Sequence, residues 1–364
     1  MNDKQNRITS FWQTISHPIL GLSPMDGVTD FPFRHITKKY GNPAVIYTEF
    51  TSVEGVCHGA EQLMKDFLFD ETQRPIIGQI YGTTPDFFRQ TAIILCQLGF
   101  DGVDINMGCP AKNVAHSGAG AALIKTPDLA QEIIRQTKLG IEQWHNGASA
   151  KDCPEITTGI AKEVETRAGA LPEKYLDRTR YIPVSVKTRV GYDLPVIQEW
   201  ISTLLDMDID AIALHGRTLK QQYGGLASWE LIGQAALLTK KAGIVLVGNG
   251  DIKTLADAHA KIETYGTNGV LIGRASMGNP FIFKEDSEYP DHDRLFKIAL
   301  EHAELFEKSY QDNERYNFLP MRKHLGWYVH DITNAILMRQ AIYRCNSSSE
   351  FAEVMKSFSY SCGR

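Results

Sequence analysis

The sequence predicts an α/β fold: a (β/α)8, or TIM, barrel followed by a small α-helical domain. Short apolar, β-rich runs alternate with helix-like segments between residues 19 and 273. Residues 291–364 contain helix-like runs and no clear strand. The chain has 364 residues, which accommodates a barrel of about 250 residues, an insertion and a further small domain.

The expected strands are mostly apolar through their centres, which is typical of parallel strands covered on both faces. They span residues 19–25, 44–50, 75–81, 102–107, 183–189, 211–215, 244–248 and 269–273. A doubly wound open sheet is the alternative fold. However, the first strand is followed by Ser23-Pro24-Met25-Asp26-Gly27, which is not the glycine-rich turn that such a sheet uses to bind a dinucleotide.

Helix-like segments separate these strands, at residues 86–99, 128–139, 194–206 and 228–242. The segment 128–139 follows Pro127 and precedes Gly140. Proline favours the first turn of a helix and glycine its end, so both limits of this helix are predicted by these two residues.

Two segments are additional to a minimal barrel. Residues 141–181 carry mixed charge and are long for a connection between a helix and a strand. We expect an insertion there, with one or two helices, on the N-terminal face of the barrel. The second segment holds the helix-like runs 295–310, 321–329, 332–339 and 349–358. The predicted division is therefore a barrel domain, 1–290, and a helical domain, 291–364.

Composition excludes several classes of protein. The chain is 43% hydrophobic and 22% charged, which is typical of a folded protein. No apolar run is long enough to span a bilayer, and residues 1–10 are too polar for a secretory signal. The six cysteines form no CxxC pair, so neither a metal site nor a disulfide framework is expected. A cytoplasmic monomer is the resulting expectation.

The net charge of -5 shows no basic domain of the kind that binds nucleic acid. A local basic face can nevertheless exist on an acidic protein, so this total does not decide the partner.

Barrel enzymes work at the C-terminal ends of their strands. The last two strands end in Gly248-Asn249-Gly250-Asp251 and in Gly273-Arg274. Glycines let backbone N–H groups approach an anion, and an arginine can pair with two phosphate oxygens. These loops predict a phosphate site, for a flavin mononucleotide or a sugar phosphate. The alternative is that the glycines only make tight turns.

Three further strand ends carry reactive side chains. Cys109 lies between Gly108 and Pro110, and an ordinary thiol, with a pKa of about 8.5, can donate a proton or act as a nucleophile. Lys187 could form a Schiff base, bind an anion or face the pyrimidine ring of a flavin. His215 could contact a ligand. The alternative for Cys109 and for His215 is simple packing in the core.

Taken together, these motifs resemble those of the tRNA-dihydrouridine synthases, flavin-dependent barrel enzymes that reduce specific uridines in tRNA. The matching stretches occur in the family's order over nearly the whole barrel. They are residues 23–30, 78–82, 104–112, 118–121, 186–191, 215–218, 248–252 and 273–280. Residues 322–328 resemble the helical domain of the bacterial B-type branch.

The resemblance implies a set of roles. FMN would pass a hydride from its N5 to C6 of the uracil, Cys109 would protonate C5, and NADPH, with NADH possible, would reduce the flavin. Asn106 would touch the flavin or the uracil edge. The isoalloxazine ring would contact Pro24, Met25, Gln79, Lys187 and His215. The ribityl phosphate would be held by Gly248, Asn249, Gly250, Asp251, Gly273 and Arg274.

The implied partner is tRNA, whose target base must be flipped out to reach the flavin. The candidate RNA contacts are Lys112, Arg189, Arg217, Arg322 and Lys323. The arginines at strand ends could equally pair with neighbouring carboxylates. The insertion is longer than the family's usual connection.

Two other functions are weighed against this one. An FMN barrel dehydrogenase acting on a free pyrimidine or another small molecule would have little use for the helical tail. A non-redox RNA-binding protein would not need Cys109, Lys187 and His215. The modified tRNA position is not predictable from these residues.

Overall fold

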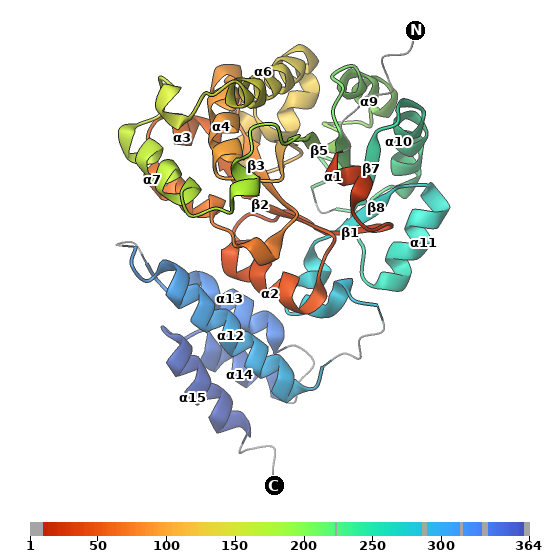
Figure 1. The fold of residues 1–364 in the computed structure, drawn as a ribbon. Coiled ribbons are helices and arrows are strands. Elements are labelled where there is room, and N and C mark those ends of the chain that lie inside the picture. Colours follow the sequence, from red (N-terminus) through yellow and green to blue (C-terminus); the bar gives the residue numbers. More distant parts are fainter. Residues whose placement is uncertain (1–9, 223, 286–289, 314–315, 330–333, 360–364) are drawn as a thin grey trace.

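The computed structural model describes residues 10–222, 224–285, 290–313, 316–329 and 334–359. Eight parallel strands form a closed barrel in chain order, with β1 pairing with both β2 and β8 (Figure 1). The predicted (β/α)8 barrel is therefore confirmed. The strands are β1 (Ile19–Leu22), β2 (Val45–Ser52), β3 (Ile76–Tyr81), β4 (Gly102–Met107), β5 (Val184–Gly191), β6 (Ala211–Thr218), β7 (Val245–Asn249) and β8 (Gly269–Ile272).

Helices surround the barrel and bury the outer faces of its strands (Figure 1). The main ones are α2 (Phe31–Gly41), α4 (Pro85–Gln97), α6 (Pro127–His145), α9 (Ile197–Leu205), α10 (Trp229–Ala242) and α11 (Leu255–Tyr265). Short segments, α3 (Val53–Cys57) and α5 (Lys112–His116), follow β2 and β4.

The interior of the barrel is packed with side chains from the strands. Tyr47, Ile77 and Leu271 belong to this inner cluster, and Trp12 of α1 (Phe11–Thr14) packs onto it with 1% of its surface exposed. Trp12 precedes β1 and therefore covers the N-terminal end of the barrel. A ligand site at the C-terminal end of the strands is consistent with this arrangement.

The prediction that a helix ends before Gly140 is wrong, because α6 continues to His145. A Cβ atom at Gly140 would lie 2.2 Å from the carbonyl oxygen of Arg89 in α4. The glycine thus permits close packing of α6 against α4 instead of ending the helix. Strands β5 and β6 are also longer than predicted, since they pair with each other as far as Gly191 and Thr218.

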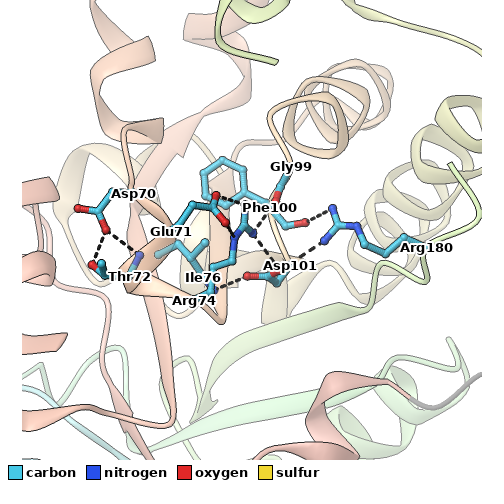
Figure 2. A network of polar contacts seen from close by, with 9 residues as sticks. All are labelled: Asp70, Glu71, Thr72, Arg74, Ile76, Gly99, Phe100, Asp101 and Arg180. Atoms are coloured by element: carbon cyan, nitrogen blue, oxygen red, sulfur yellow. Dashed lines mark hydrogen bonds and ion pairs between the residues drawn. The ribbon is translucent and has the colours of Figure 1, made fainter. Parts of the chain in front are cut away.

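The segment 141–181 completes α6 and adds α7 (Thr158–Ala168) and α8 (Glu173–Leu176). Its far end lies against the N-terminal ends of the strands. There, Asp101 accepts hydrogen bonds from Arg74, Arg180 and the backbone N–H of Ile76 (Figure 2). Asp101 precedes β4 and Ile76 begins β3, so the network ties the end of this segment to the start of two strands.

Helix α7 contacts a different part of the barrel. Arg167 donates hydrogen bonds to the carbonyl oxygens of Met64 and Phe67 in the 3-10 helix η2 (Glu61–Phe67). This helix belongs to the connection between β2 and β3. The 141–181 segment therefore packs along the side of the barrel as well as at its N-terminal end.

The described residues of the C-terminal tail form four helices, and α12 (His292–Tyr310) packs beside α2 (Figure 1). The other three are α13 (Leu319–Tyr328), α14 (Ala335–Ile342) and α15 (Ser348–Ser359). The core of the four helices includes two residues from the barrel side, Ile36 of α2 and Phe281. Glu301 of α12 also accepts hydrogen bonds from Lys39 and Tyr40 of α2.

Some features considered above lie outside the described residues: positions 1–9, the start of the expected helix 332–339, and Cys362, one of the six cysteines. Within the described part of the chain, no helix is both long and apolar enough to cross a membrane. The same part holds no cluster of three or more His, Cys, Asp or Glu side chains suited to a metal ion.

Candidate active site

A cavity of about 660 Å³ opens at the C-terminal ends of the strands. It brings together side chains and backbone from widely separated strand ends. The expected residues that line it are Pro24, Met25, Asn106, Cys109, Lys112, Lys187, Arg189, His215, Arg217, Asn249, Gly250, Asp251, Gly273 and Arg274. Its size is typical of sites for small-molecule ligands and cofactors.

Cys109 lies on the turn that follows β4, and this turn is held by Asn106. The Asn106 side-chain oxygen accepts hydrogen bonds from the backbone N–H groups of Gly108 and Cys109, at 3.0 and 2.9 Å. Cys109 is 8% exposed. Burial raises the pKa of the Cys109 thiol, against smaller opposing effects of Arg189 and Lys187. At neutral pH the group is therefore a thiol that can donate a proton.

A run of small residues, 118–122, packs against the backbone of Cys109. A Cβ atom at Gly120 would lie 3.0 Å from the Cys109 carbonyl oxygen, and Gly120 has a φ of 60°. The backbone N–H of Ala121 donates to the same carbonyl. The small side chains at 118–122 thus let the chain pass directly beneath the reactive cysteine, a role that their composition alone only suggested.

Lys187 contributes a buried amino group to the cavity. Burial, and to a smaller extent the charge of Arg189, lowers the pKa of Lys187 to about 8, while Asp104 and Cys109 act in the opposite direction. The Lys187 Nζ donates a hydrogen bond to Asn249 Oδ1 at 3.3 Å. Lys187 is thus a cation near neutral pH that can pair with a negatively charged ligand.

His215 is held in its neutral form. Burial and the nearby cations Arg189, Lys187, Arg217 and Arg274 lower the pKa of His215 to about 2. Its Nε2 lies 3.4 Å from Nη1 of Arg217. Because a guanidinium only donates, this contact assigns the acceptor role to Nε2 and the proton to Nδ1.

Asp251, in the loop after β7, forms ion pairs with two arginines. Its carboxylate pairs with Arg217 Nη2 at 2.7 Å and with Arg274 Nη2 at 2.9 Å, and it accepts the N–H of Ala227. Burial opposes ionisation, but the hydrogen bonds from Ala227 and Arg217 outweigh it and lower the pKa of Asp251. The Asp251 carboxylate therefore holds two positively charged arginines beside the glycine-rich loops.

A family model described as "Dihydrouridine synthase (Dus)" matches residues 21–143 and 172–361. This chain belongs to the dihydrouridine synthase family. The resemblance drawn from the motifs is confirmed, and with it the assignment of the protein as an enzyme. Residues 144–171, which include α7, lie outside the match.

Curated relatives resemble the chain over almost its full length. A "Probable tRNA-dihydrouridine synthase" of Staphylococcus aureus (strain COL) is 32% identical over 354 residues, covering 96% of this chain and 95% of the relative. A "Probable tRNA-dihydrouridine synthase 2" of Bacillus subtilis (strain 168) is 31% identical and covers 96% of both chains.

Two solved structures have lower similarity. A variant of NCR from Zymomonas mobilis has a TM-score of 0.46 at 15% identity, covering 78% of this chain and 94% of that one. Morphinone reductase has a TM-score of 0.45 at 11% identity, covering 78% and 90%.

Two residues expected to contact the cofactor in this family member lie away from the cavity wall. Gln79 is fully buried, and its amide is hydrogen-bonded to Asp104 and to Asn106. A Cβ atom at Gly248 would lie 2.5 Å from the Trp229 ring, so this glycine makes room for α10. Neither residue lines the cavity, and their contacts with the cofactor stay predictions.

The residues expected to contact RNA lie in different surroundings. Arg189 and Arg217 are each 3% exposed. Arg189 donates to the carbonyl oxygens of Gly108 and Thr218, while Arg217 pairs with Asp251. Both arginines thus organise the cavity wall, and the carboxylate pairing considered as the alternative is seen for Arg217. Contact of either arginine with RNA stays a prediction.

The remaining candidates include one exposed residue at the cavity and two residues of α13. Lys112 is exposed at the edge of the cavity. Arg322 donates hydrogen bonds to Cys345 O and Asn346 Oδ1 inside the tail. The Nζ of Lys323 would lie 3.2 Å from a Cβ atom at Gly27, so Lys323 places the tail beside the loop after β1.

Several lining residues were given no role in the sequence analysis, among them Phe50 and, within the family motifs, Asp26 and Met277. Phe50 lies near the end of β2 and makes an edge contact with the Tyr81 ring at 5.0 Å. Its position near a strand end was the available signal, but attention to polar groups alone overlooked an aromatic residue.

Proposed function

We propose that the protein reduces the C5=C6 bond of specific uridines in tRNA to 5,6-dihydrouridine, with FMN as bound cofactor and NADPH as reductant. The observation that carries this proposal is the buried, proton-bearing Cys109 in the same cavity as Lys187, in a chain of the dihydrouridine synthase family. The names of the curated relatives support tRNA as the substrate.

The residues present fit FMN. Gly250, with a φ of 130°, and Gly273 provide backbone without side chains at the cavity wall. Arg217 and Arg274 place positive charge beside these glycines, which suits the ribityl phosphate. Lys187 would then face the pyrimidine end of the isoalloxazine ring. The chemistry that FMN would supply when bound is the hydride for C6 of the uracil.

The side chains of this protein perform the remaining tasks. Cys109 donates its proton to C5 of the uracil, and the burial that raises its pKa keeps the proton available. Lys187 stabilises negative charge in the cavity. This electrostatic attraction is stronger in a buried site than in water. The flipped base would enter the cavity that Cys109 and the aromatic ring of Phe50 both line.

The proposal extends to the whole chain. Residues 1–290 would form the FMN-binding catalytic domain and residues 291–364 a tRNA-binding domain, in a cytoplasmic monomer. Lys112, which is exposed, and Lys323, which lies beside Gly27, are the proposed RNA contacts nearest to the cavity.

The deciding experiment compares Cys109→Ala with Cys96→Ala. Both proteins are loaded with FMN and incubated with NADPH and unmodified tRNA, and dihydrouridine is measured by mass spectrometry. We expect Cys109→Ala to retain FMN but to lose at least about 100-fold in rate, since general acids contribute on that order. Cys96, buried in α4, does not line the cavity, and its variant should remain active.

Two outcomes would contradict the proposal. Undiminished dihydrouridine formation by Cys109→Ala would remove Cys109 as the acid. Reduction of free uracil or uridine by the wild-type protein, with no reaction on tRNA, would favour a dehydrogenase of small molecules.

A further inference from the structure

A continuous chain of buried hydrogen bonds runs from β3 and β4 to the reactive cysteine. Asp104 Oδ2 accepts from Gln79 Nε2 at 2.7 Å. Gln79 Oε1 accepts from Asn106 Nδ2 at 3.0 Å. Asn106 Oδ1 in turn accepts from the N–H groups of Gly108 and Cys109. Asp104 and Gln79 are 0% exposed, and Asn106 is 6% exposed.

The carboxylate at one end determines the orientation of both amides. Asp104 Oδ1 accepts from Ser185 Oγ at 2.5 Å, so both carboxylate oxygens act as acceptors. The Gln79 NH2 group must therefore point to Asp104, and its oxygen must point to Asn106. Asn106 must then turn its NH2 group to Gln79, which leaves its oxygen for the Cys109 turn.

We propose that Asp104 and Gln79 are positioning residues that orient Asn106 and thereby hold Cys109 in the geometry for proton donation. Gln79 and Asp104 are paired neighbours in β3 and β4, two residues deeper in the barrel than Asn106. The arrangement is thus anchored in the sheet itself. The inference rests on the proposed function only for the role of the proton; the hold on Cys109 can be measured without tRNA or cofactor.

The test is the substitution Gln79→Glu. While it is protonated, the introduced carboxylic acid can still donate to Asp104 and accept from Asn106, so the chain of hydrogen bonds survives at low pH. As the pH rises, the two facing carboxylates lose their shared proton and repel each other. The other titratable groups that act on Asp104 or respond to it are Lys187 on β5 and Tyr47 on β2. Neither is altered by the substitution.

The measurement is the rate of alkylation of Cys109 by iodoacetamide across pH, followed by mass spectrometry of the peptide. In the wild type we expect a slow rate that rises only with ionisation of the thiol. In Gln79→Glu, an additional step of on the order of tenfold should appear as the shared proton is lost and the turn loosens. Gln79→Met removes both hydrogen bonds of the Gln79 amide and introduces no titratable group. Its Cys109 should therefore be alkylated faster than in the wild type at every pH, without the additional step.

The double variant Asp104→Asn with Gln79→Glu supplies the decisive comparison. In this variant the new amide NH2 group at position 104 can donate to the new carboxylate at position 79. That carboxylate still accepts from Asn106, so the wild-type pH profile should return. Packing alone would not produce this reciprocal rescue.

Two results would overturn the inference: a double variant that behaves like Gln79→Glu, or a Gln79→Met protein that alkylates like the wild type. Absence of dihydrouridine formation by the wild type would instead contradict the proposed function and leave these rates interpretable.

Discussion

At the residue scale, burial sets the protonation state of three side chains in the cavity. It raises the pKa of Cys109, lowers that of Lys187 to about 8 and lowers that of His215 to about 2. Near neutral pH the cavity therefore holds a thiol, a cation and a neutral imidazole. This combination suits a site that donates one proton and binds an anionic group.

Lys187 should make the proposed binding of FMN dependent on pH. Its charged form should donate best to the carbonyl groups at the pyrimidine end of the flavin, so affinity should fall on the order of tenfold as the pH rises through about 8. Titration of the apoprotein with FMN from pH 7 to pH 9, followed by flavin fluorescence, measures this dependence. Lys187→Met should bind weakly and lose most of the slope.

Lys125→Met is the matched control for this experiment. Lys125 is exposed and pairs with Asp193, away from the lining of the cavity. Its variant should keep the wild-type slope. An equal slope in Lys187→Met would assign the pH dependence to another group.

At the element scale, the 141–181 segment is attached to the barrel by charged hydrogen bonds. Asp101 accepts hydrogen bonds from Arg74 and Arg180, and the Arg180 side chain also donates one to the Phe100 carbonyl oxygen (Figure 2). The Arg74 guanidinium lies 3.3 Å from the centre of the Tyr175 ring. These contacts lie at the N-terminal ends of the strands, opposite the cavity.

Removal of the Asp101 carboxylate should therefore affect stability and leave the chemistry intact. Asp101→Ala leaves the Ile76 N–H without its acceptor and removes one acceptor each from Arg74 and Arg180, which keep Glu71 and the Phe100 carbonyl oxygen. It should lower the free energy of unfolding by about 2 kcal/mol. Urea unfolding followed by circular dichroism measures the change. Glu173→Ala, at an exposed position of α8, serves as the control and should change stability little.

At the scale of the whole molecule, the barrel and the tail share a core. Phe33 of α2 contacts the His302 and His324 rings, with centroids 6.0 and 5.6 Å apart. Ile36 and Phe281 complete the tail's apolar cluster. Removal of residues 291–364 would expose these side chains, so tRNA binding is better tested by single substitutions such as Lys323→Ala than by truncation.

The two buried histidines make this junction sensitive to acid. Burial lowers the pKa of His302 to about 3 and that of His324 well below 6.5. The unfolded chain therefore takes up protons near pH 6.5 that the folded protein does not. Stability is fully present above this pH and falls as the pH decreases toward the folded pKa values.

His324→Phe should reduce this loss. Phenylalanine can pack against Phe33 and Trp327, and the variant should lower the pH slope of the unfolding free energy by up to about 1.4 kcal/mol per unit below pH 6. Urea unfolding at several pH values provides the measurement. His292→Phe, at an exposed position of α12, should keep the wild-type slope, and an unchanged slope in His324→Phe would contradict the assignment.

Much of the site could be predicted because its residues are adjacent in sequence to strand ends. Apolar runs locate the strands, and parallel strands in a barrel bring their C-terminal ends together. Cys109, Lys187 and His215 therefore had to lie near one another once the barrel was predicted. The family motifs extended this reasoning to the glycines and Arg274.

Gln79, Gly140 and Arg217 show what such reasoning could not reach, and at Gly140 the predicted end of the helix was wrong. Each was interpreted from its local sequence, but each is used by a partner distant in the chain: Asp104 for Gln79, Arg89 for Gly140 and Asp251 for Arg217.

The sequence by itself determined the barrel, the order of its strands and the reactive groups at their ends, because hydrophobic periodicity and short motifs are local properties. Only the tertiary structure decided which of these groups face the cavity, which support others and which of the buried groups remain ionised. Those outcomes depend on desolvation and on hydrogen-bond partners that the fold brings together from distant parts of the chain.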